Sequence, residues 1–501
     1  MMNFVSYLFE HHRDPQKIVL FGDNLTITYG ELTGRLNQVS AWIFQKYGGD
    51  NKFLILADNS PFFILSYLGV IQSGNTAVLV ETRPSKSDLE YIIGSTVSPA
   101  IFAEKKYLPA LKDLGPEIIT EDMIGEIPET GASPAPLFCE KEEAVAVIIF
   151  TSGSTGTKKG VMLTHKNLAA NTESIVHYLQ LTEKDRVCVV LPFFYCYGAS
   201  LLHTHIRVGG SLVLTRKTFL GSIIKDIDKY QCTGFAGVPS TFQILINKTP
   251  FLESQLPSLR YLTQAGGKLA DKYIGILCDH FSDKQIFIMY GATEATARLS
   301  YLPPALIRKK MGSIGKGIPG VILAVLDENG RQVKTGEVGE IAACGENIMK
   351  GYYGDTKGTA AVIRNGWLFT GDMGTTDEEG YIFVTGRSKN IIKSGGYRIS
   401  PYEVESEILS LANISGCVVL GIPDDLMGEA VVAIVQTGSD SDNSISPEEI
   451  LAHCNRRLPP YKVPQKIVFM DQFPLNSSGK VDMIRVKEMI INSGDNGASR
   501  Q

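Results

Sequence analysis

The feature of this sequence that most restricts its fold is a series of short aliphatic runs separated by amphipathic stretches. The run AVAVIIFT (144–151) is aliphatic almost throughout, and VCVVLPFF (187–194), SLVLT (211–215) and QIFIMYG (285–291) have the same character. A strand that is apolar along its whole length is typical of a parallel sheet covered by helices on both faces. About the first 380 residues are therefore predicted to be α/β.

The pattern changes twice further along the chain. After GVILAVLDENGRQV (320–333) the segments become β-rich, with turns expected at 328–330 and 379–380. A new unit then begins with SPYEVESEILSL (400–411), whose serine and early proline are typical of a helix start. A second helix is predicted at 446–458, and strands at 416–425, 430–438 and 465–471.

These changes predict two domains. The first is a large N-terminal part over residues 1–386, with several subdomains, parallel-type sheets and a β-rich segment. The second is a small α+β domain over residues 387–501, which is a plausible domain size. The polar stretch 386–390 is the expected boundary, and residues 492–501 are expected to be a frayed tail.

Composition excludes several classes of protein. The chain has 501 residues, more than one hydrophobic core holds, and its 44% hydrophobic and 20% charged residues are those of an ordinary globular protein. A formal net charge of -5 argues against nucleic-acid binding. The apolar stretches around 60–72 and 144–150 are too short or interrupted to predict a transmembrane segment.

The cysteines and histidines predict neither disulfides nor a metal centre. The eight cysteines show no CxxC pair or zinc-like spacing, and no signal peptide opens the chain. We therefore expect reduced cysteines in a cytoplasmic protein. His203 and His205 lie two apart on a predicted helix, so they do not share a face and are expected in the core or on the surface.

The glycine-rich loop TSGSTGTKKG (151–160) follows the buried strand directly. α/β sheets place their ligands at such strand ends. Glycines allow close approach to a ligand, and their N–H groups can form an anion-binding nest. Hydroxyls and two lysines add further donors, more than a structural turn requires. The loop therefore predicts a polyphosphate site.

Two better-known nucleotide motifs fit less well. In the loop, Gly153 and Gly156 are too close for a Walker motif, and Lys159 is followed by glycine. A P-loop kinase is therefore disfavoured. The literal GxGxxG at 315–320 lacks a strand before it and is followed by the strand-like VILAVLD, so a dinucleotide site there is not expected.

Taken together with later motifs, the chain resembles the adenylate-forming superfamily, which includes acyl-CoA synthetases, luciferases and adenylation domains. The loop at 151–165 is similar to the phosphate loop of this superfamily, and nearly the whole chain is covered by motifs in family order. These further motifs are MYGATEAT (289–296), GEVGEIAACGENIMKGYY (336–353), GWLFTGDMG (366–374), GRSKNIIKSGGYRISPYEVE (386–405) and PLNSSGK (474–480), with weaker matches at 27–32 and 67–80.

The resemblance implies an ATP site. Ser152, Ser154, Thr155 and Lys159 are the implied partners of the β- and γ-phosphates. The full implied set for the nucleotide is Thr151, Ser152, Ser154, Thr155, Lys159, Gly267, Tyr290, Asp372 and Arg387. Within it, Asp372 accepts the ribose hydroxyls with the help of Arg387, and Tyr290 and the stretch 264–267 flank the adenine.

The resemblance also implies the catalytic residues. Thr293 contacts the α-phosphate, and Glu294 holds Mg²⁺. Lys480 is the cation that meets both the carboxylate and the α-phosphate, so the small domain has to close on the large one.

In such enzymes the small domain then rotates for the second half-reaction. Lys389 matches the hinge position, which absorbs backbone rotation without doing chemistry. Lys393, Gly395 and Gly396 would line the tunnel for the thiol, although the residues alone fit a simple β-turn almost as well.

The acid pocket departs from the family pattern in two places. Many members have histidine at the position of Tyr195, where an aromatic side chain forms a gate between the acid pocket and ATP, so whether tyrosine also acts as a gate stays open. Amino-acid-activating members have aspartate at the position of Gly198. A buried substrate ammonium without that carboxylate is strongly disfavoured. The predicted pocket residues are Tyr195, Tyr197, Gly198, Phe235, Gly266, Gly291 and Ala292. They are mostly apolar or small, which suits an aromatic or aliphatic acid.

The sequence therefore predicts an AMP-forming carboxylic acid–thiol ligase. It would use ATP and Mg²⁺ to make an acyl-adenylate, and then pass the acyl group to CoA or to the phosphopantetheine of a carrier protein. Transfer of the adenylate to an amine or another nucleophile is the alternative within the family. A P-loop-type kinase and a non-catalytic nucleotide-binding protein are the alternatives outside it. The acid and the oligomeric state stay open.

Overall fold

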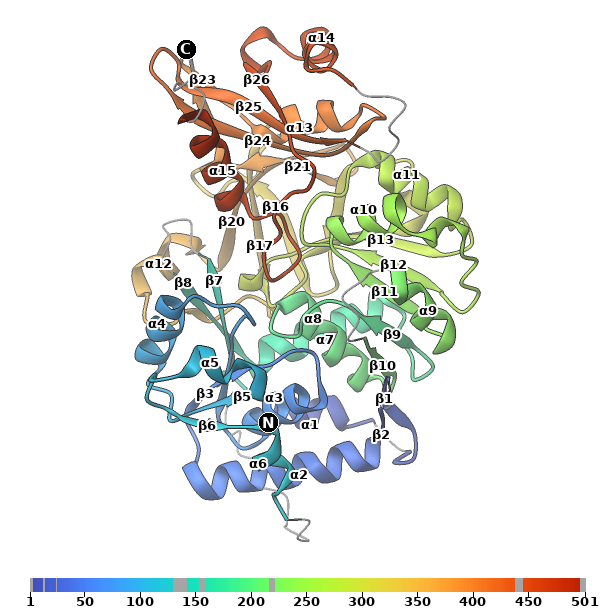
Figure 1. Cartoon of the computed structure of the whole chain (residues 1–501), viewed down its shortest axis with the longest axis vertical. Helices are drawn as coiled ribbons and strands as arrows, with labels where there is room; N and C mark the ends of the chain where they lie inside the picture. The colour runs from blue at the N-terminus through green and yellow to red at the C-terminus, as the bar shows by residue number, and fades with distance from the viewer. Residues whose placement is uncertain are drawn as a thin grey trace.

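The structure is a computed structural model, and it describes residues 3–11, 14–23, 25–128, 142–152, 158–215, 221–437 and 445–495. In these ranges two large sheets and their helices form a lower body, and a smaller sheet with its own helices lies above it (Figure 1). No described helix is both long and apolar enough to span a bilayer. The described cysteines are all free.

The largest sheet joins a parallel half to an antiparallel half. Its parallel half has the order β1-β10-β9-β11-β12-β13, and its antiparallel half continues through β14, β15, β21, β20, β17 and β16. The strands are β1 (Ile18–Gly22), β2 (Leu25–Thr28), β9 (Arg186–Val189), β10 (Ser211–Leu214), β11 (Gly234–Gly237), β12 (Tyr261–Gln264), β13 (Gln285–Tyr290), β14 (Ser300–Leu302), β15 (Ser313–Gly317), β16 (Val321–Leu326), β17 (Gly339–Gly345), β19 (Ile363–Arg364), β20 (Trp367–Thr376) and β21 (Ile382–Arg387).

The second sheet is mostly parallel, with the order β18-β8-β7-β4-β3-β5-β6. The strands are β3 (Lys52–Leu56), β4 (Thr76–Leu79), β5 (Ala100–Ala103), β6 (Glu117–Ile119), β7 (Val145–Ser152), β8 (Lys158–Thr164) and β18 (Gly351–Tyr352). The helices of the large part are α1 (Phe4–Phe9), α2 (Tyr29–Tyr47), α3 (Pro61–Gln72), α4 (Lys86–Thr96), α5 (Leu108–Leu111), α6 (Glu121–Gly125), α7 (His165–Leu179), α8 (Cys196–Arg207), α9 (Gly221–Lys229), α10 (Pro239–Lys248), α11 (Asp271–His280) and α12 (Thr356–Val362).

Strand alternation divides the large part into layers. On β13, Phe287 and Met289 join the core that also contains α3, α7 and α8, whereas Ile286 and Ile288 join the core under α10 and α11. Successive side chains of a strand point to opposite faces, so each strand is buried on both sides. The prediction of helix-covered α/β sheets is confirmed.

The C-terminal residues form a third sheet with cores of their own on both faces. Its strands pair in the order β23-β22-β25-β24, with β26 parallel to β25. The elements are β22 (Ile392–Ser394), β23 (Tyr397–Ile399), β24 (Ile414–Asp424), β25 (Gly428–Thr437), β26 (Lys466–Phe469), α13 (Pro401–Leu409), α14 (Pro447–Arg457) and α15 (Met483–Asp495).

Three details differ from the sequence prediction. β9 ends at Val189 rather than at 194, because Pro192 cannot continue a ladder and the next residues lead into α8. The tail expected to fray from residue 492 continues as α15 through Asp495. The GxGxxG segment at 315–320 was expected to lack a strand before it, but it begins within β15; it then leads into β16 and not into a helix.

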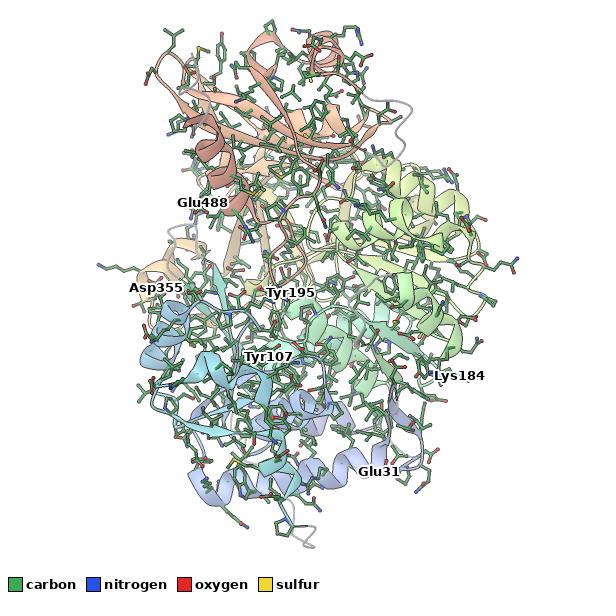
Figure 2. All side chains as sticks on the ribbon, in the orientation of Figure 1. Glu31, Tyr107, Lys184, Tyr195, Asp355 and Glu488 are labelled. Carbon is green, nitrogen blue, oxygen red and sulfur yellow. The ribbon has the colours of Figure 1, made fainter. Side chains whose placement is uncertain are left out.

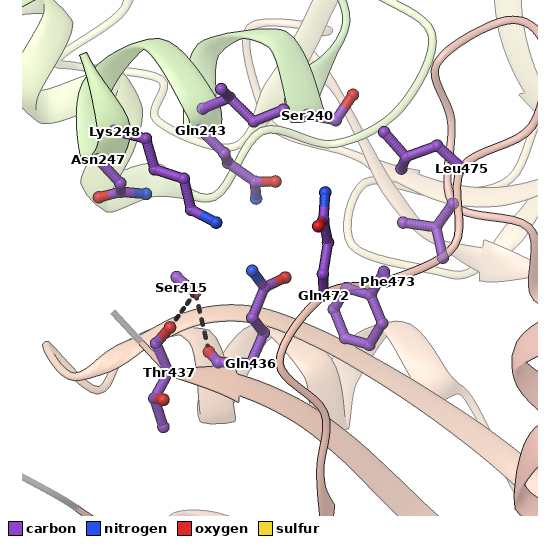
Figure 3. A pocket seen from close by; sticks show the side chains of 12 residues that line it. Ser240, Gln243, Asn247, Lys248, Ser415, Gln436, Thr437, Gln472, Phe473 and Leu475 are labelled. Atoms are coloured by element: carbon purple, nitrogen blue, oxygen red, sulfur yellow. Dashed lines mark hydrogen bonds between the residues drawn. The ribbon is translucent and has the colours of Figure 1, made fainter. Parts of the chain in front are cut away.

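Around α10, the interface between the lower body and the C-terminal unit is lined mostly by polar side chains. Figure 3 shows Gln243 and Asn247 of α10 facing Gln436 and Gln472 across a small pocket. Nearby, the Tyr273 hydroxyl donates to the Ser415 carbonyl oxygen over 3.1 Å. Interfaces of this character resemble those of transient complexes, in which two bodies can separate and rearrange.

Candidate active site

Lys480 lies on a tight loop that reaches from the C-terminal unit into the lower body. Asn476 organises the loop, because its side-chain oxygen accepts hydrogen bonds from the backbone N–H groups of Ser478 (3.0 Å) and Lys480 (3.1 Å). Gly479 has φ +79°, a left-handed conformation that glycine adopts without strain. Its carbonyl oxygen accepts a hydrogen bond from Ser240, which ties the loop to α10.

The Lys480 ammonium is held against two predicted pocket residues. Its Nζ lies 4.9 Å from the ring centroid of Tyr195, which Figure 2 shows near the centre of the molecule. A Cβ added to Gly266 would lie 3.2 Å from Lys480 Cε, so the glycine makes room for the lysine. Burial lowers the pKa of Lys480, and the charge of Arg387 acts in the same direction. The structure therefore brings this lysine to residues more than 200 positions away in the chain.

Thr293 and Glu294 lie beside this group, in a single 3₁₀ turn just beyond β13. The Thr293 hydroxyl is 3.5 Å from the Cys196 sulfur at the start of α8. The Glu294 Oε1 accepts a hydrogen bond from the Tyr352 hydroxyl over 2.9 Å. Among the described residues no donor is recorded for its Oε2, which is therefore available to a ligand.

Asp372 forms a compact cluster with two other predicted nucleotide residues. Its Oδ2 accepts a hydrogen bond from the Tyr290 hydroxyl, and its Oδ1 accepts one from Arg387 Nε, each over 2.6 Å. Burial and the neighbouring carboxylate raise the pKa of Tyr290 well above its ordinary value, so Tyr290 is a hydrogen-bond donor here. β20 pairs Asp372 with Arg387 on β21, which explains why residues fifteen positions apart meet.

The glycine-rich loop connects β7 to β8 as a hairpin, with Thr151 paired to Lys159. Lys159 Nζ lies 3.5 Å from Asp355 Oδ2 and 4.5 Å from the ring centroid of Tyr352. The predictions for Ser154 and Thr155, and for the side chain of Ser152, lie outside the described residues.

The two tyrosines of α8 differ in their surroundings. Burial raises the pKa of the Tyr195 phenol, which stays neutral next to Lys480. The Tyr197 hydroxyl is 2.8 Å from Thr263 Oγ1, and the Arg298 guanidinium lies 3.9 Å from the Tyr197 ring centroid.

Two glycines of the predicted pocket are required by close backbone packing. A Cβ at Gly198 would lie 2.0 Å from the Pro192 carbonyl oxygen, and one at Gly291 would lie 1.9 Å from the Ala297 carbonyl oxygen. Neither position can carry a side chain without a backbone shift. Backbone packing therefore requires glycine at position 198, whatever the substrate.

A cleft of about 830 Å³ runs along the interface beside these groups. Its lining includes Gly266, Gly267, Tyr290, Gly291, Asp372, Arg387, Lys389 and Lys480. Ala292 continues the strand end next to Gly291.

Phe235 does not join this group. It packs on Phe242 of α10, with ring centroids 6.0 Å apart, in the core on the opposite face of the sheet from Ala236. Phe235 is fully buried and does not line the cleft in the described structure, so its place in the acid pocket stays a prediction.

The predicted hinge and tunnel residues lie apart from each other. Lys389 lies in a short 3₁₀ turn, Ser388–Asn390, at the edge of the cleft. Gly395 and Gly396, with φ +56° and +84°, form the exposed turn between β22 and β23, next to Lys393. In the described structure this turn contributes nothing to the lining of the cleft.

Several residues around the site were not predicted from sequence. Tyr352 contacts both Lys159 and Glu294, and Asp355 pairs with Lys159. Glu81 binds both Lys158 and Ser477. Arg298 lies in the apolar stretch after MYGATEAT, and an arginine in an apolar stretch was the one available signal.

The chain is similar to known proteins in both sequence and structure. The sequence model described as "AMP-binding enzyme" matches residues 9–353, and the one described as "AMP-binding enzyme C-terminal domain" matches residues 403–480. A feruloyl-CoA synthase of Amycolatopsis is 30% identical over 91% of this chain and 92% of its own. A 2-succinylbenzoate–CoA ligase of Bacillus pumilus is 30% identical over 94% and 95%. The match to the putative acyl-CoA synthetase YngI of Bacillus subtilis, at 32% identity, spans 68% of this chain and 63% of that protein.

Solved structures have the same fold. ATP-bound MatB from Rhodopseudomonas palustris superposes with a TM-score of 0.88 at 26% identity, covering 97% of this chain and 98% of the other. The o-succinylbenzoate CoA synthetase MenE of Bacillus subtilis, bound to its acyl-adenylate intermediate, has a TM-score of 0.84 at 26% identity, with coverage of 97% and 98%.

Proposed function

We propose that this chain, which belongs to the AMP-binding enzyme family and is an AMP-forming acid–CoA ligase, performs adenylation at the group formed by Lys480, Thr293 and Glu294. One observation carries the proposal. A lysine on the C-terminal unit is buried against the strand ends of the lower body, beside residues that can hold a nucleotide. A lysine with a purely solvated role would not be brought there.

In the first half-reaction the acid carboxylate attacks the α-phosphorus of ATP. An oxygen–phosphorus bond forms, the bond to the β-phosphate bridge breaks, and pyrophosphate leaves. The barrier is largely the repulsion between an anion and a polyanion. The Lys480 ammonium lowers it by meeting both species, and the Thr293 hydroxyl donates to the α-phosphate.

The residues present fit a magnesium ion. Mg²⁺ is typically bound through one or two carboxylates together with substrate phosphates, and Glu294, the residue after Thr293, offers its Oε2. When bound, the ion offsets part of the triphosphate charge. Tyr352 holds the Glu294 carboxylate in place from the other side.

The nucleoside is held by the cluster around Asp372. Each carboxylate oxygen already accepts one hydrogen bond, from Tyr290 or from Arg387, and retains a second lone pair for a ribose hydroxyl. Tyr290 and Gly267 flank the adenine. The β7–β8 loop, through Thr151, Ser152, Ser154, Thr155 and Lys159, binds the β- and γ-phosphates.

In the second half-reaction the C-terminal unit that follows Lys389 turns about this residue, and the thiol displaces AMP from the acyl-adenylate. This motion would replace the Lys480 loop with the Lys393–Gly396 turn. The polar interface around α10 can be remade in a second arrangement more readily than a hydrophobic one. CoA is the acceptor, and the phosphopantetheine of a carrier protein has the same thiol.

The test is acid-dependent exchange of pyrophosphate into ATP, with Mg²⁺ and a panel of carboxylic acids. We expect exchange, and AMP rather than ADP as product once CoA is added. Lys480→Ala should abolish exchange but leave thioester formation from supplied acyl-adenylate largely intact. Lys389→Ala is the matched control for the second half-reaction. Equal loss of both half-reactions in Lys480→Ala would contradict the two-arrangement scheme, and ADP as product would indicate a kinase.

A further inference from the structure

A second cation, Arg298, is buried next to Tyr197, one of the predicted pocket residues. Arg298 is only 2% exposed to solvent. In the described structure its guanidinium contacts the Met289 sulfur (Nε, 3.4 Å), the carbonyl oxygen of its neighbour Ala297 (Nη1, 3.5 Å), the ring of Tyr197 and the hydroxyl of Tyr178. None of these partners is a carboxylate, and a thioether is a weak acceptor.

The position of Arg298 is fixed by buried hydrogen bonds to its backbone. Its carbonyl oxygen accepts from Asn171 Nδ2 over 3.1 Å and from Asn347 Nδ2 over 2.9 Å. Both asparagines are buried. Several hydrogen bonds therefore hold this arginine inside the protein, although a buried charge is costly unless it is paired.

Arg298 lies directly behind residues that line the cleft. A Cβ on Gly291 would lie 2.9 Å from the Arg298 Cα, so the two backbones touch. Gly291 and Met289 both line the cleft, and Met289 bears the sulfur that contacts the guanidinium. The guanidinium is thus one residue behind the cleft wall.

The two cations of the site lie on either side of the start of α8. Lys480 contacts the ring of Tyr195, and Arg298 contacts the ring of Tyr197. Burial raises the pKa of the Cys196 thiol between these residues, while the charges of both Lys480 and Arg298 act in the opposite direction. Both charges are therefore close to the same short segment.

We propose that Arg298 binds a second carboxylate, at the far end of the substrate, so that the enzyme activates a dicarboxylic acid. This inference rests on the proposed adenylation by Lys480. One carboxylate would meet Lys480 and react, and the other would pair with the guanidinium of Arg298, which has no carboxylate partner among the described residues. A guanidinium suits this role because its planar donors match a carboxylate in a bidentate pair.

The first test uses the unmodified protein and acids that differ only at the far end. Pyrophosphate exchange is measured with α,ω-dicarboxylic acids of two to six carbons and with terephthalate. Each acid is compared with its monoamide and with a monocarboxylic acid of matched length. Because leaving a buried charge unpaired costs at least about 2 kcal/mol, the best dicarboxylate should exceed its monoamide about 30-fold or more in kcat/KM.

The second test uses two variants. Arg298→Met should remove the preference by lowering kcat/KM for the dicarboxylate about 30-fold while leaving the monocarboxylic acid within about threefold. Arg298→Lys should keep part of the preference. Thermal melting with and without ATP checks that each variant is folded. If a variant does not fold, the ratio of kcat/KM for the dicarboxylate to kcat/KM for its monoamide, measured with the unmodified protein, still tests the inference.

Four results would overturn the inference. Better activation of monoamides or monocarboxylic acids by the unmodified protein would exclude a carboxylate at Arg298. An equal loss for all acids in Arg298→Met would assign the residue to packing alone. Exchange with monocarboxylic acids only would refute this inference but leave the proposed function intact, whereas no exchange with any acid would refute both.

Discussion

Glu81 joins the phosphate hairpin to the catalytic loop, and this contact predicts a selective kinetic effect. One of its carboxylate oxygens accepts a hydrogen bond from Lys158 on β8, and the other accepts one from the Ser477 hydroxyl. Ser477 is three residues before Lys480. The contact therefore exists only while the Lys480 loop is docked in the lower body.

The expected size of the effect follows from burial. The side chains of Glu81 and Lys158 are 29% and 14% exposed. Hydrogen bonds to charged groups contribute about 1.5 to 3 kcal/mol when buried, and exposed ion pairs contribute less than about 1 kcal/mol. For this half-buried contact we take about 1.4 kcal/mol. This corresponds to about a tenfold smaller equilibrium constant for docking of the Lys480 loop in Glu81→Ala.

The assay compares the two half-reactions. In Glu81→Ala we expect kcat/KM for pyrophosphate exchange to fall about tenfold, and thioester formation from supplied acyl-adenylate to change by less than about twofold. Asp88→Ala is the matched control, because Asp88 also contacts Lys158, over 3.4 Å, but is not bonded to the Ser477 hydroxyl. It should leave both rates nearly unchanged.

A double-mutant cycle with Ser477→Ala then isolates the contact. If Glu81 acts through Ser477, the double variant should lose no more exchange activity than the single variant that loses more. Additive losses, or equal losses in both half-reactions, would refute the reasoning, because they would mean that Glu81 supports the lower body regardless of the docked loop.

Three other predictions follow from the site and the core. Tyr290→Phe removes the 2.6 Å donor to Asp372, so the KM for ATP in exchange should rise about fivefold, and an unchanged KM would contradict the cluster. Gly198→Ala places a Cβ 2.0 Å from the Pro192 carbonyl oxygen, so the melting temperature should fall by several degrees; an unchanged melting temperature would show that the backbone yields at no cost. Burial lowers the pKa of His203 from 6.5 to about 3, so the unfolded chain binds a proton that the folded protein does not, and stability should fall as the pH drops below about 6.5. His203→Gln keeps a partner for the Tyr67 hydroxyl and should flatten that fall in melting experiments, whereas an unchanged slope would contradict it.

Local patterns in the sequence determined much of this protein. The aliphatic runs predicted the strands of the parallel sheets, and the pairs Ser400-Pro401 and Ser446-Pro447 predicted the starts of α13 and α14. The turns at Gly330 and Gly380 were also predicted, and both glycines have positive φ. These features depend on neighbours in the chain, so a single sequence contains them.

Only the tertiary structure decided which distant groups meet. Strand alternation took Phe235 to the far face, and close packing explained Gly198 without reference to a substrate. The environment of Arg298 could not be predicted, because the asparagines that fix it are 127 and 49 residues away in the chain. A motif specifies which groups are available, but burial and the absence of a carboxylate partner are properties of the folded core, where residues far apart in sequence share one space.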